Sequence, residues 1–272
     1  MNLGKIKIDR KWIAVGVVVF LVVAYVIILA AHRGVNANKT VVVTDEHGNE
    51  IEVQDGLYGR TELLFYFRDN DGSGMLFGVD ADLTNHKIGV SAIPDDQGYL
   101  MNGAAVTIGT IYAGGGLEGV RNAVNQRTAA SYQRVYICTP AQFAKVTDLL
   151  GKVTVNTPEG FSYSGSSATV NLKPGANAIS GNDLYLYLKY GGGENVSYEM
   201  RGDVFAGMLR AYLTPENIAG GEKLFDELVN AAQTDITAYD RSAWEDRIAA
   251  AANSDTLVIE NDGFAGYAGN EG

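Results

Sequence analysis

The stretch from Ala141 to Lys189 constrains the fold of this chain most, because helical and extended patterns follow one another closely within it. A helical pattern closes at Leu149-Leu150-Gly151, and Val153 and Val155 then alternate with polar residues. A Leu-Lys-Pro-Gly turn leads into a second helical pattern. Strands that interleave with helices in this way are typical of α/β domains. The sequence therefore predicts an α/β fold, with a mixed sheet in a three-layer α/β/α domain.

The remaining elements are predicted from the same periodicities and from turn and cap residues. Thr139 fits a helix N-cap, with Pro140 as the first helical residue. The predicted strands are residues 40–44, 50–53, 62–67, 75–79, 87–93, 134–138, 153–155, 168–172 and 255–260. One predicted helix begins after Gly116 and runs to about Gln126. The others cover about 140–151, 180–190, 196–212, 215–233 and 241–253.

Trp12–Ala31 is a run of twenty uncharged, mostly aliphatic residues. As a helix it would be roughly 30 Å long, the thickness of a bilayer's hydrocarbon core. Four basic residues precede it, which favours a cytoplasmic N-terminus and an exported C-terminal part in the cell membrane. The alternative is a cleavable signal peptide, whose apolar region is usually about 7–15 residues long. We expect a cytoplasmic tail at 1–11, a transmembrane helix at 12–31, a linker at 32–40, an extracellular domain at 41–260 and a flexible tail at 261–272.

The charge of the chain limits its partners. The net charge is −11, and the four basic and one acidic residues before the apolar run leave −14 for everything after it. A surface this acidic disfavours nucleic acid and anionic lipid headgroups as partners. Cys138 is the only cysteine, which excludes an intrachain disulfide, and its apolar neighbours predict a buried thiol.

Six motifs, in order over residues 61–240, resemble the extracellular domain of the LytR-CpsA-Psr family. They are Leu63–Phe65, Met75–Val79, the Val90–Asp96 stretch beside the family's Ser-Ile-Pro-Arg-Asp, Gly114-Gly115, the helix with Arg201, Phe205 and Leu209, and Thr234–Thr237. The resemblance implies the family's fold and a place in the bacterial cell envelope. It also implies kinship with enzymes that move glycopolymers from a polyprenyl pyrophosphate carrier onto peptidoglycan.

The resemblance implies a diphosphate site formed by Asp96, Lys189 and Arg201, with Mg²⁺ held by Asp69 or Asp71. The chain departs from the family's motifs at several of these positions. Asp95 stands where the family has an arginine, and Gly191 where it has the second of a pair of arginines. One arginine and one lysine make a poor diphosphate clamp, because lysine lacks the bidentate fork of arginine.

Asp69–Gly74 also has the Asp-x-Asp-x-Ser-Gly spacing that opens a calcium loop. Hard carboxylate oxygens at Asp69 and Asp71 would suit Ca²⁺ outside the cell. The alternative is a tight polar turn, for which Asp, Asn and Gly are the usual residues.

The resemblance further implies an apolar groove for a polyprenyl phosphate lipid, between the sheet and the helix at 181–190. The side chains expected to line it are Phe65, Phe67, Leu76, Val90, Tyr185 and Leu188. The alternative is that these residues pack against each other and leave no void.

Two functions follow from these patterns. In the first, the protein transfers a polyprenyl-linked glycan to peptidoglycan. In the second, it is a catalytically inactive family member that binds lipid, glycan or another envelope protein during wall assembly. The sequence leaves open whether the protein is an enzyme.

Overall fold

The computed structural model describes residues 40–44, 50–54, 60–82, 86–95, 98–101, 103–128, 130–165, 168–191, 197–214, 222–237 and 257–264. The predictions for residues 1–39, for the helix at 241–253 and for Asp96 lie outside these ranges. Among the helices of the described ranges, none combines the length and the apolar character that crossing a membrane requires.

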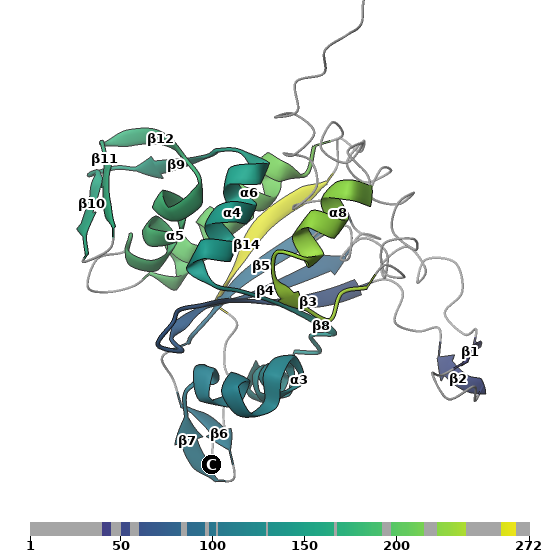
Figure 1. Ribbon diagram of the computed structural model, residues 1–272. Coiled ribbons are helices and arrows are strands. Elements are labelled where there is room, and N and C mark those ends of the chain that lie inside the picture. The colour runs from purple at the N-terminus through teal and green to yellow at the C-terminus, as the bar shows by residue number, and fades with distance from the viewer. Residues whose placement is uncertain are drawn as a thin grey trace, which may run out of the picture.

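A six-stranded mixed sheet forms the centre of the molecule, in the order β13-β8-β3-β4-β5-β14 (Figure 1). Its strands are β3 (Arg60–Arg68), β4 (Gly74–Asp82), β5 (Lys87–Ile93), β8 (Arg134–Cys138), β13 (Gln233–Thr234) and β14 (Val258–Phe264). β3 pairs in parallel with β8 and antiparallel with β4, which pairs antiparallel with β5; β5 pairs in parallel with β14. Four strands therefore run in one direction and end at the same edge of the sheet.

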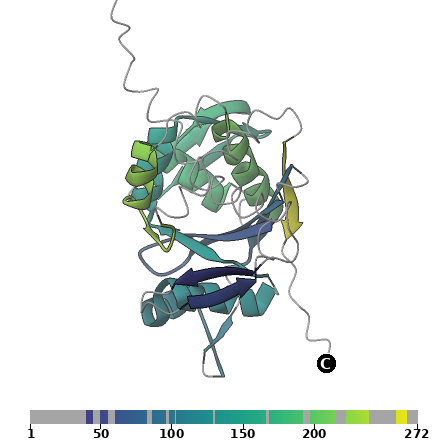
Figure 2. The same ribbon diagram turned by 90° about the vertical axis from the view of Figure 1, so that its right-hand side faces the viewer.

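Helices cover both faces of the sheet, as Figures 1 and 2 show from two sides. One face carries α4 (Pro140–Leu150), α5 (Gly181–Tyr190), α6 (Tyr198–Tyr212) and α8 (Glu222–Val229), and the other carries α3 (Ile108–Thr128). The alternation along β3 explains the two cores. Leu63, Phe65 and Phe67 belong to the cluster beneath α4–α8, while Leu64 and Tyr66 belong to the cluster beneath α3. The predicted three-layer α/β/α fold is confirmed.

Four antiparallel pairs lie outside the central sheet. They are β1 (Thr40–Thr44) with β2 (Glu50–Gln54), β6 (Tyr99–Met101) with β7 (Ala104–Val106), β9 (Val153–Thr157) with β12 (Gly175–Ile179), and β10 (Phe161–Ser164) with β11 (Thr169–Leu172). The sequence patterns missed β6, β7, β10 and β12. β6 and β7 are only three residues long, and β12 is rich in Gly, Ala and Asn, so these three lack the apolar alternation that marks a strand. β10 does alternate, as Phe-Ser-Tyr-Ser, but over only four residues.

The helix boundaries follow from local chemistry. α4 begins with the predicted cap: the Thr139 hydroxyl accepts from the Gln142 backbone N–H, and Pro140 takes the first turn. α3 differs from its prediction, because it also covers Ile108–Gly115 and kinks at Gly116, whose φ is 57°. β14 continues to Phe264, so residues 261–264 belong to the sheet and not to the tail expected from 261.

Candidate functional site

The polar candidate site lies at the edge of the sheet where its parallel strands end. Asp69 directly follows β3, and Asp95 follows β5 after one residue. Lys189 is in the last turn of α5, and Arg201 is near the start of α6. In open α/β sheets ligands bind at this edge, beyond the carboxyl ends of the strands. The fold therefore brings Asp69, Lys189 and Arg201, three residues singled out from the sequence, to the usual binding position.

Asp69 is held by two side chains of α5. Its Oδ1 accepts a hydrogen bond of 2.7 Å from the Tyr185 hydroxyl, and its Oδ2 pairs with Lys189 Nζ. The side chains of Asp69 and Lys189 are only 15% and 18% exposed. Burial lowers the pKa of Lys189, but the hydrogen bond and the charge of Asp69 outweigh it, so the pKa of Lys189 is raised. Burial, and then the bond to Asp69, raise the pKa of Tyr185. The lysine therefore stays a cation whose charge is already compensated.

The loop Asp69–Ser73 is closed by its own hydrogen bonds. Asp71 Oδ1 accepts from the Ser73 backbone N–H at 3.0 Å and from the Ser73 hydroxyl at 2.7 Å. These two bonds, the hydroxyl first, lower the pKa of Asp71, whose side chain faces solvent. The carbonyl of Gly72 accepts from the Tyr66 hydroxyl at 2.7 Å. These bonds close the segment into a tight polar turn.

Arg201 is almost fully buried, and its guanidinium contacts other groups of the protein. Nε donates to the Leu188 carbonyl at 3.1 Å, and Nη2 donates to the Lys189 carbonyl at 3.2 Å. Nη1 lies 3.6 Å from Asp95 Oδ1, in a pair whose side chains are 6% and 15% exposed. Arg201 thus binds the last carbonyls of α5, which have no partner within the helix, and neutralises Asp95.

The residues present do not fit the divalent cation expected at Asp69 and Asp71. The Asp69 carboxylate is engaged by the ammonium of Lys189, and the Asp71 oxygen is engaged by Ser73. A cation ligated at Asp69 would lie beside the lysine's positive charge. Within the ranges described, no three His, Cys, Asp or Glu side chains gather in a metal-binding arrangement.

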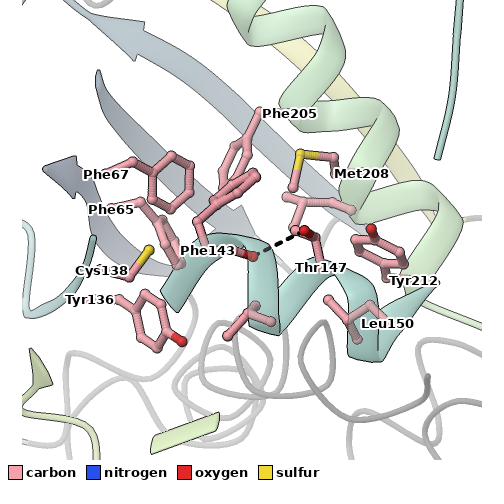
Figure 3. A pocket seen from close by; sticks show the side chains of 12 residues that line it. Phe65, Phe67, Tyr136, Cys138, Phe143, Thr147, Leu150, Phe205, Met208 and Tyr212 are labelled. Atoms are coloured by element: carbon pink, nitrogen blue, oxygen red, sulfur yellow. Dashed lines mark hydrogen bonds between the residues drawn. The ribbon is translucent and has the colours of Figure 1, made fainter. Parts of the chain in front are cut away.

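The apolar part of the site is a cavity of about 40 Å³ between the sheet, α4 and α6 (Figure 3). Phe65, Phe67, Tyr136 and Cys138 line it from the strands. The helices supply the rest of the lining, which consists of Phe143, Val146, Thr147, Leu150, Phe205, Met208, Leu209 and Tyr212. The Thr147 hydroxyl donates to the Phe143 carbonyl at 3.0 Å, so it is satisfied within α4. For comparison, an engineered apolar cavity that binds benzene measures roughly 150 Å³.

Aromatic rings pack closely between the sheet and the helices α4 and α6. The rings of Phe77 and Phe205 stack at 4.5 Å, and Phe67 meets Phe143 edge-on at 4.8 Å. Only Phe65 and Phe67 of the six predicted lining residues contact the cavity. Val90, Tyr185 and Leu188 lie in the same core cluster but line no part of the cavity.

Leu76 was assigned to the wrong face of the sheet. It lies beneath α3, because it pairs with Tyr66 across β3 and β4 and therefore points to the same side as Tyr66.

The pairing of Arg201 with Asp95 was missed from the sequence. The sequence interpretation treated Asp95 only as a negative charge in place of an arginine. The positive charge of Arg201 on a predicted helix was the sequence feature that could have indicated a partner for Asp95. The second missed feature is Tyr185, which was assigned to a lipid groove but gives its hydroxyl to Asp69. Its position in an apolar run hid the polar role.

Comparisons with known proteins agree with this geometry. The model of the LytR_cpsA_psr family matches residues 73–263. No curated protein matches the chain. Among solved structures, TagV of B. subtilis is 16% identical with a TM-score of 0.61, covering 75% of this chain and 84% of TagV. A putative transcription regulator from Eubacterium siraeum is 19% identical with a TM-score of 0.60, covering 84% and 89%. TagT bound to LIIa-WTA is 15% identical with a TM-score of 0.53, covering 70% and 75%.

The fold defines an α/β protein of the type that these solved structures share. The family match extends over well over half of the chain, and on that ground the chain belongs to the LytR-CpsA-Psr family.

Proposed function

We propose that this protein acts in the attachment of glycopolymers to bacterial peptidoglycan, as a membrane-anchored envelope protein that does not transfer the polymer itself. Family membership supports the process, because the family's enzymes take glycopolymers from polyprenyl pyrophosphate carriers. The structure of TagT with LIIa-WTA adds support from a protein of the same fold. The uncharged run Trp12–Ala31, with basic residues before it, supports an anchor whose following domain lies outside the cell.

The observation that carries the non-transferring role is the pairing of both candidate cations with aspartates of this chain. Lys189 pairs with Asp69, and Arg201 pairs with Asp95. Phosphoryl transfer depends on cations placed around the transferred group. A diphosphate entering here would have to displace two carboxylates and would then lie beside them. Since each carboxylate repels the phosphate, the resident ion pairs oppose binding of the substrate's reacting group.

The filled core supports the same conclusion. A polyprenyl tail contains many five-carbon units, whereas the cavity of about 40 Å³ is smaller than the space that one benzene ring needs. Opening it would require moving Phe143 or Phe205 out of close ring contacts. The core between the sheet, α4 and α6 therefore does not enclose the carrier's tail, and the protein is suited to contact the glycan, peptidoglycan or another envelope protein through its surface.

A second function, transfer of the polyprenyl-linked glycan, is favoured by one observation. Asp69, Lys189 and Arg201 still gather at the edge where an α/β sheet binds its ligands. In that function Asp96, Lys189 and Arg201 surround the diphosphate, and the two ion pairs open when the substrate arrives.

One experiment separates these functions. The full chain, in detergent, is incubated with a polyprenyl-pyrophosphate-linked glycan and purified peptidoglycan, with TagT as the positive control. Glycan bound covalently to peptidoglycan is then measured. We expect no transfer by this chain, together with sedimentation of the chain with insoluble peptidoglycan. Transfer that is lost in Lys189→Met would establish the transferase function instead.

A further inference from the structure

The β6–β7 hairpin exposes apolar side chains at its tip. Leu100 is 68% exposed and Met101 is 39% exposed. Within the described ranges only Val258 joins them as an exposed large hydrophobic residue. Ala104 and Ala105 of the returning strand are exposed as well. Leu100 pairs with Ala105 and Met101 pairs with Ala104, and successive residues of a strand point to opposite faces, so apolar side chains project from both faces of the hairpin. Together they make the tip an apolar patch, whereas single exposed residues are common.

The sequence around this hairpin carries no charge. No Asp, Glu, Lys or Arg occurs between Asp96 and Glu118, the longest such run after Arg33. The part of the chain after the apolar N-terminal run has a net charge of −14, so this neutral run stands out against its surroundings. The run contains both strands of the hairpin and the first part of α3.

The base of the hairpin is fixed while its tip projects. Tyr99 is buried, its hydroxyl donates to the Pro94 carbonyl at 3.1 Å, and the Arg127 guanidinium lies 5.2 Å from the centre of its ring. Val106 packs against the core beneath α3. Figures 1 and 2 both show the hairpin extending beyond α3, away from the sheet. Leu100 and Met101 are therefore held away from the domain by an anchored base.

We propose that the β6–β7 hairpin inserts its tip into the outer surface of the bilayer to which the chain is anchored. The inference rests on the anchor in the proposed function. The eight residues between the apolar run and β1 span at most about 29 Å, so the domain begins close to the lipid.

The absence of charge makes this hairpin the part of the domain that fits a bilayer surface best. Acidic surface is repelled by anionic headgroups, so a neutral patch is the part of this domain that approaches them most easily. Residues without charge also avoid the large cost of placing a charge in hydrocarbon. The outer backbone groups of a two-stranded hairpin lack strand partners, and hydrocarbon cannot satisfy them. The tip therefore lies in the interfacial layer and does not cross the bilayer.

The test measures the depth of single positions in the full chain, reconstituted in phosphatidylcholine vesicles. An environment-sensitive fluorophore is attached to Leu100→Cys or, as the control, to Thr169→Cys, an exposed position of β11 on the other side of the sheet. Nitroxide groups on the lipid chains quench labels that enter the bilayer. The native Cys138 is 1% exposed and its thiol pKa is raised by burial, so the unsubstituted chain provides the blank for labelling.

We expect the label at position 100 to lose most of its fluorescence and the label at position 169 to lose none. Adding Leu100→Asp and Met101→Asp to a chain labelled at Ala105→Cys should abolish quenching while the chain still floats with the vesicles. A floating chain without quenching at position 100 overturns the hairpin proposal alone and leaves the patch as a contact for a protein. Equal quenching at both positions also overturns it. A chain that fails to float contradicts the anchor, and the hairpin proposal falls with it.

Discussion

Arg201 lies in α6 with its guanidinium turned toward the end of α5. The carbonyls of Leu188 and Lys189 are among the last four of that helix and have no partner within it, and Arg201 donates to both. The same guanidinium pairs with Asp95. The side chain therefore joins two helices and the end of β5, whether or not it ever meets a phosphate. A residue that resembles a catalytic one can be retained for structure alone.

Replacing Arg201 by methionine should destabilise the fold strongly. The substitution removes the hydrogen bonds to two helix carbonyls and the ionic contact with Asp95, whose side chain is only 15% exposed. Removal of one member of a buried ion pair costs about 3–5 kcal/mol. Urea unfolding followed by circular dichroism measures the change, with Lys152→Met, at an exposed position, as the matched control. A loss no larger than in the control would show that Arg201 has no structural role.

The pair of Lys189 and Asp69 should make stability depend on pH in the alkaline range. The pKa of Lys189 is raised in the folded protein, so its contribution is complete below the unfolded value of about 10.5. That contribution is lost as the pH rises through the folded pKa. Buried tyrosines with a raised pKa, such as Tyr185, also lower the stability of the protein as the pH rises. The effect of the ion pair is therefore measured as the difference between the wild type and a variant without it.

We expect the wild type to lose more free energy of unfolding than Lys189→Met between pH 9 and about 11.5. Urea unfolding at each pH gives both curves. Parallel curves for the two proteins would contradict the ion pair.

The contact between α3 and the loop at residues 69–73 depends on two glycines. A Cβ placed on Gly109 would lie 2.1 Å from the carbonyl oxygen of Gly72. The backbone of the helix therefore touches the backbone of the loop. Gly72 also has a φ of +82°, which side chains of L-residues rarely adopt. These glycines let α3 close over the end of β3, where Asp69 begins the site.

Gly109→Ala should destabilise the protein by about 1–3 kcal/mol, because the methyl group forces loop and helix apart. Gly207→Ala, in the interior of α6, is the matched control, since its Cβ would meet nothing within 4 Å. The control should be neutral or stabilised by about 0.5–1 kcal/mol. Thermal unfolding of both variants decides the matter. Equal effects at the two positions would mean that the close approach is not present in solution.

Truncating an aromatic side chain packed between the sheet and α4 should cost more stability than truncating a partly buried one elsewhere. Phe143 contacts Phe67 and Tyr185 and is 1% exposed, so Phe143→Ala should cost about 3–5 kcal/mol. The partly buried Phe161 is the control and should lose clearly less on the same change. Denaturant unfolding measures both. If the core instead adapts to bind a lipid tail, Phe143→Ala will be tolerated nearly as well as the control.

The sequence predicted elements well where the periodic segment was long and recognisable cap or turn residues marked its ends. α4 and the strand at Lys87–Ile93 were predicted within a residue, because an apolar period and boundary residues agreed. β12 was missed because its Gly-Ala-Asn-Ala sequence carries little strand signal and its partner β9 lies earlier in the chain. β6 was missed because it has only three residues, although the Asn102-Gly103 that follows it is a hairpin signal. The side assigned to Leu76 was wrong because the sequence shows alternation within one strand but not the register between β3 and β4. The cavity size depends on ring packing from α4 and α6, which no linear pattern contains.

At the scale of the whole molecule, charge is distributed unevenly along the chain. Basic residues precede the apolar run, acidic residues predominate after it, and one long neutral run includes the β6–β7 hairpin. The two candidate cations of the edge site are neutralised locally, so the site adds no positive field to the acidic domain. The membrane contacts that we propose therefore fall on the uncharged parts of the chain.

The last prediction concerns the apolar run Trp12–Ala31. Arginine near the centre of a membrane-spanning helix costs about 2.5–3.5 kcal/mol on insertion scales. Leu21→Arg together with Val22→Arg should therefore prevent stable insertion, whereas Leu21→Ala with Val22→Ala should leave it intact. Alkaline carbonate extraction of membranes from cells expressing the full chain measures the membrane-held fraction of each variant. We expect the arginine variant to appear in the soluble fraction and the alanine variant to stay with the membrane. If the arginine variant stays with the membrane as fully as the alanine variant, the run Trp12–Ala31 is not the anchor.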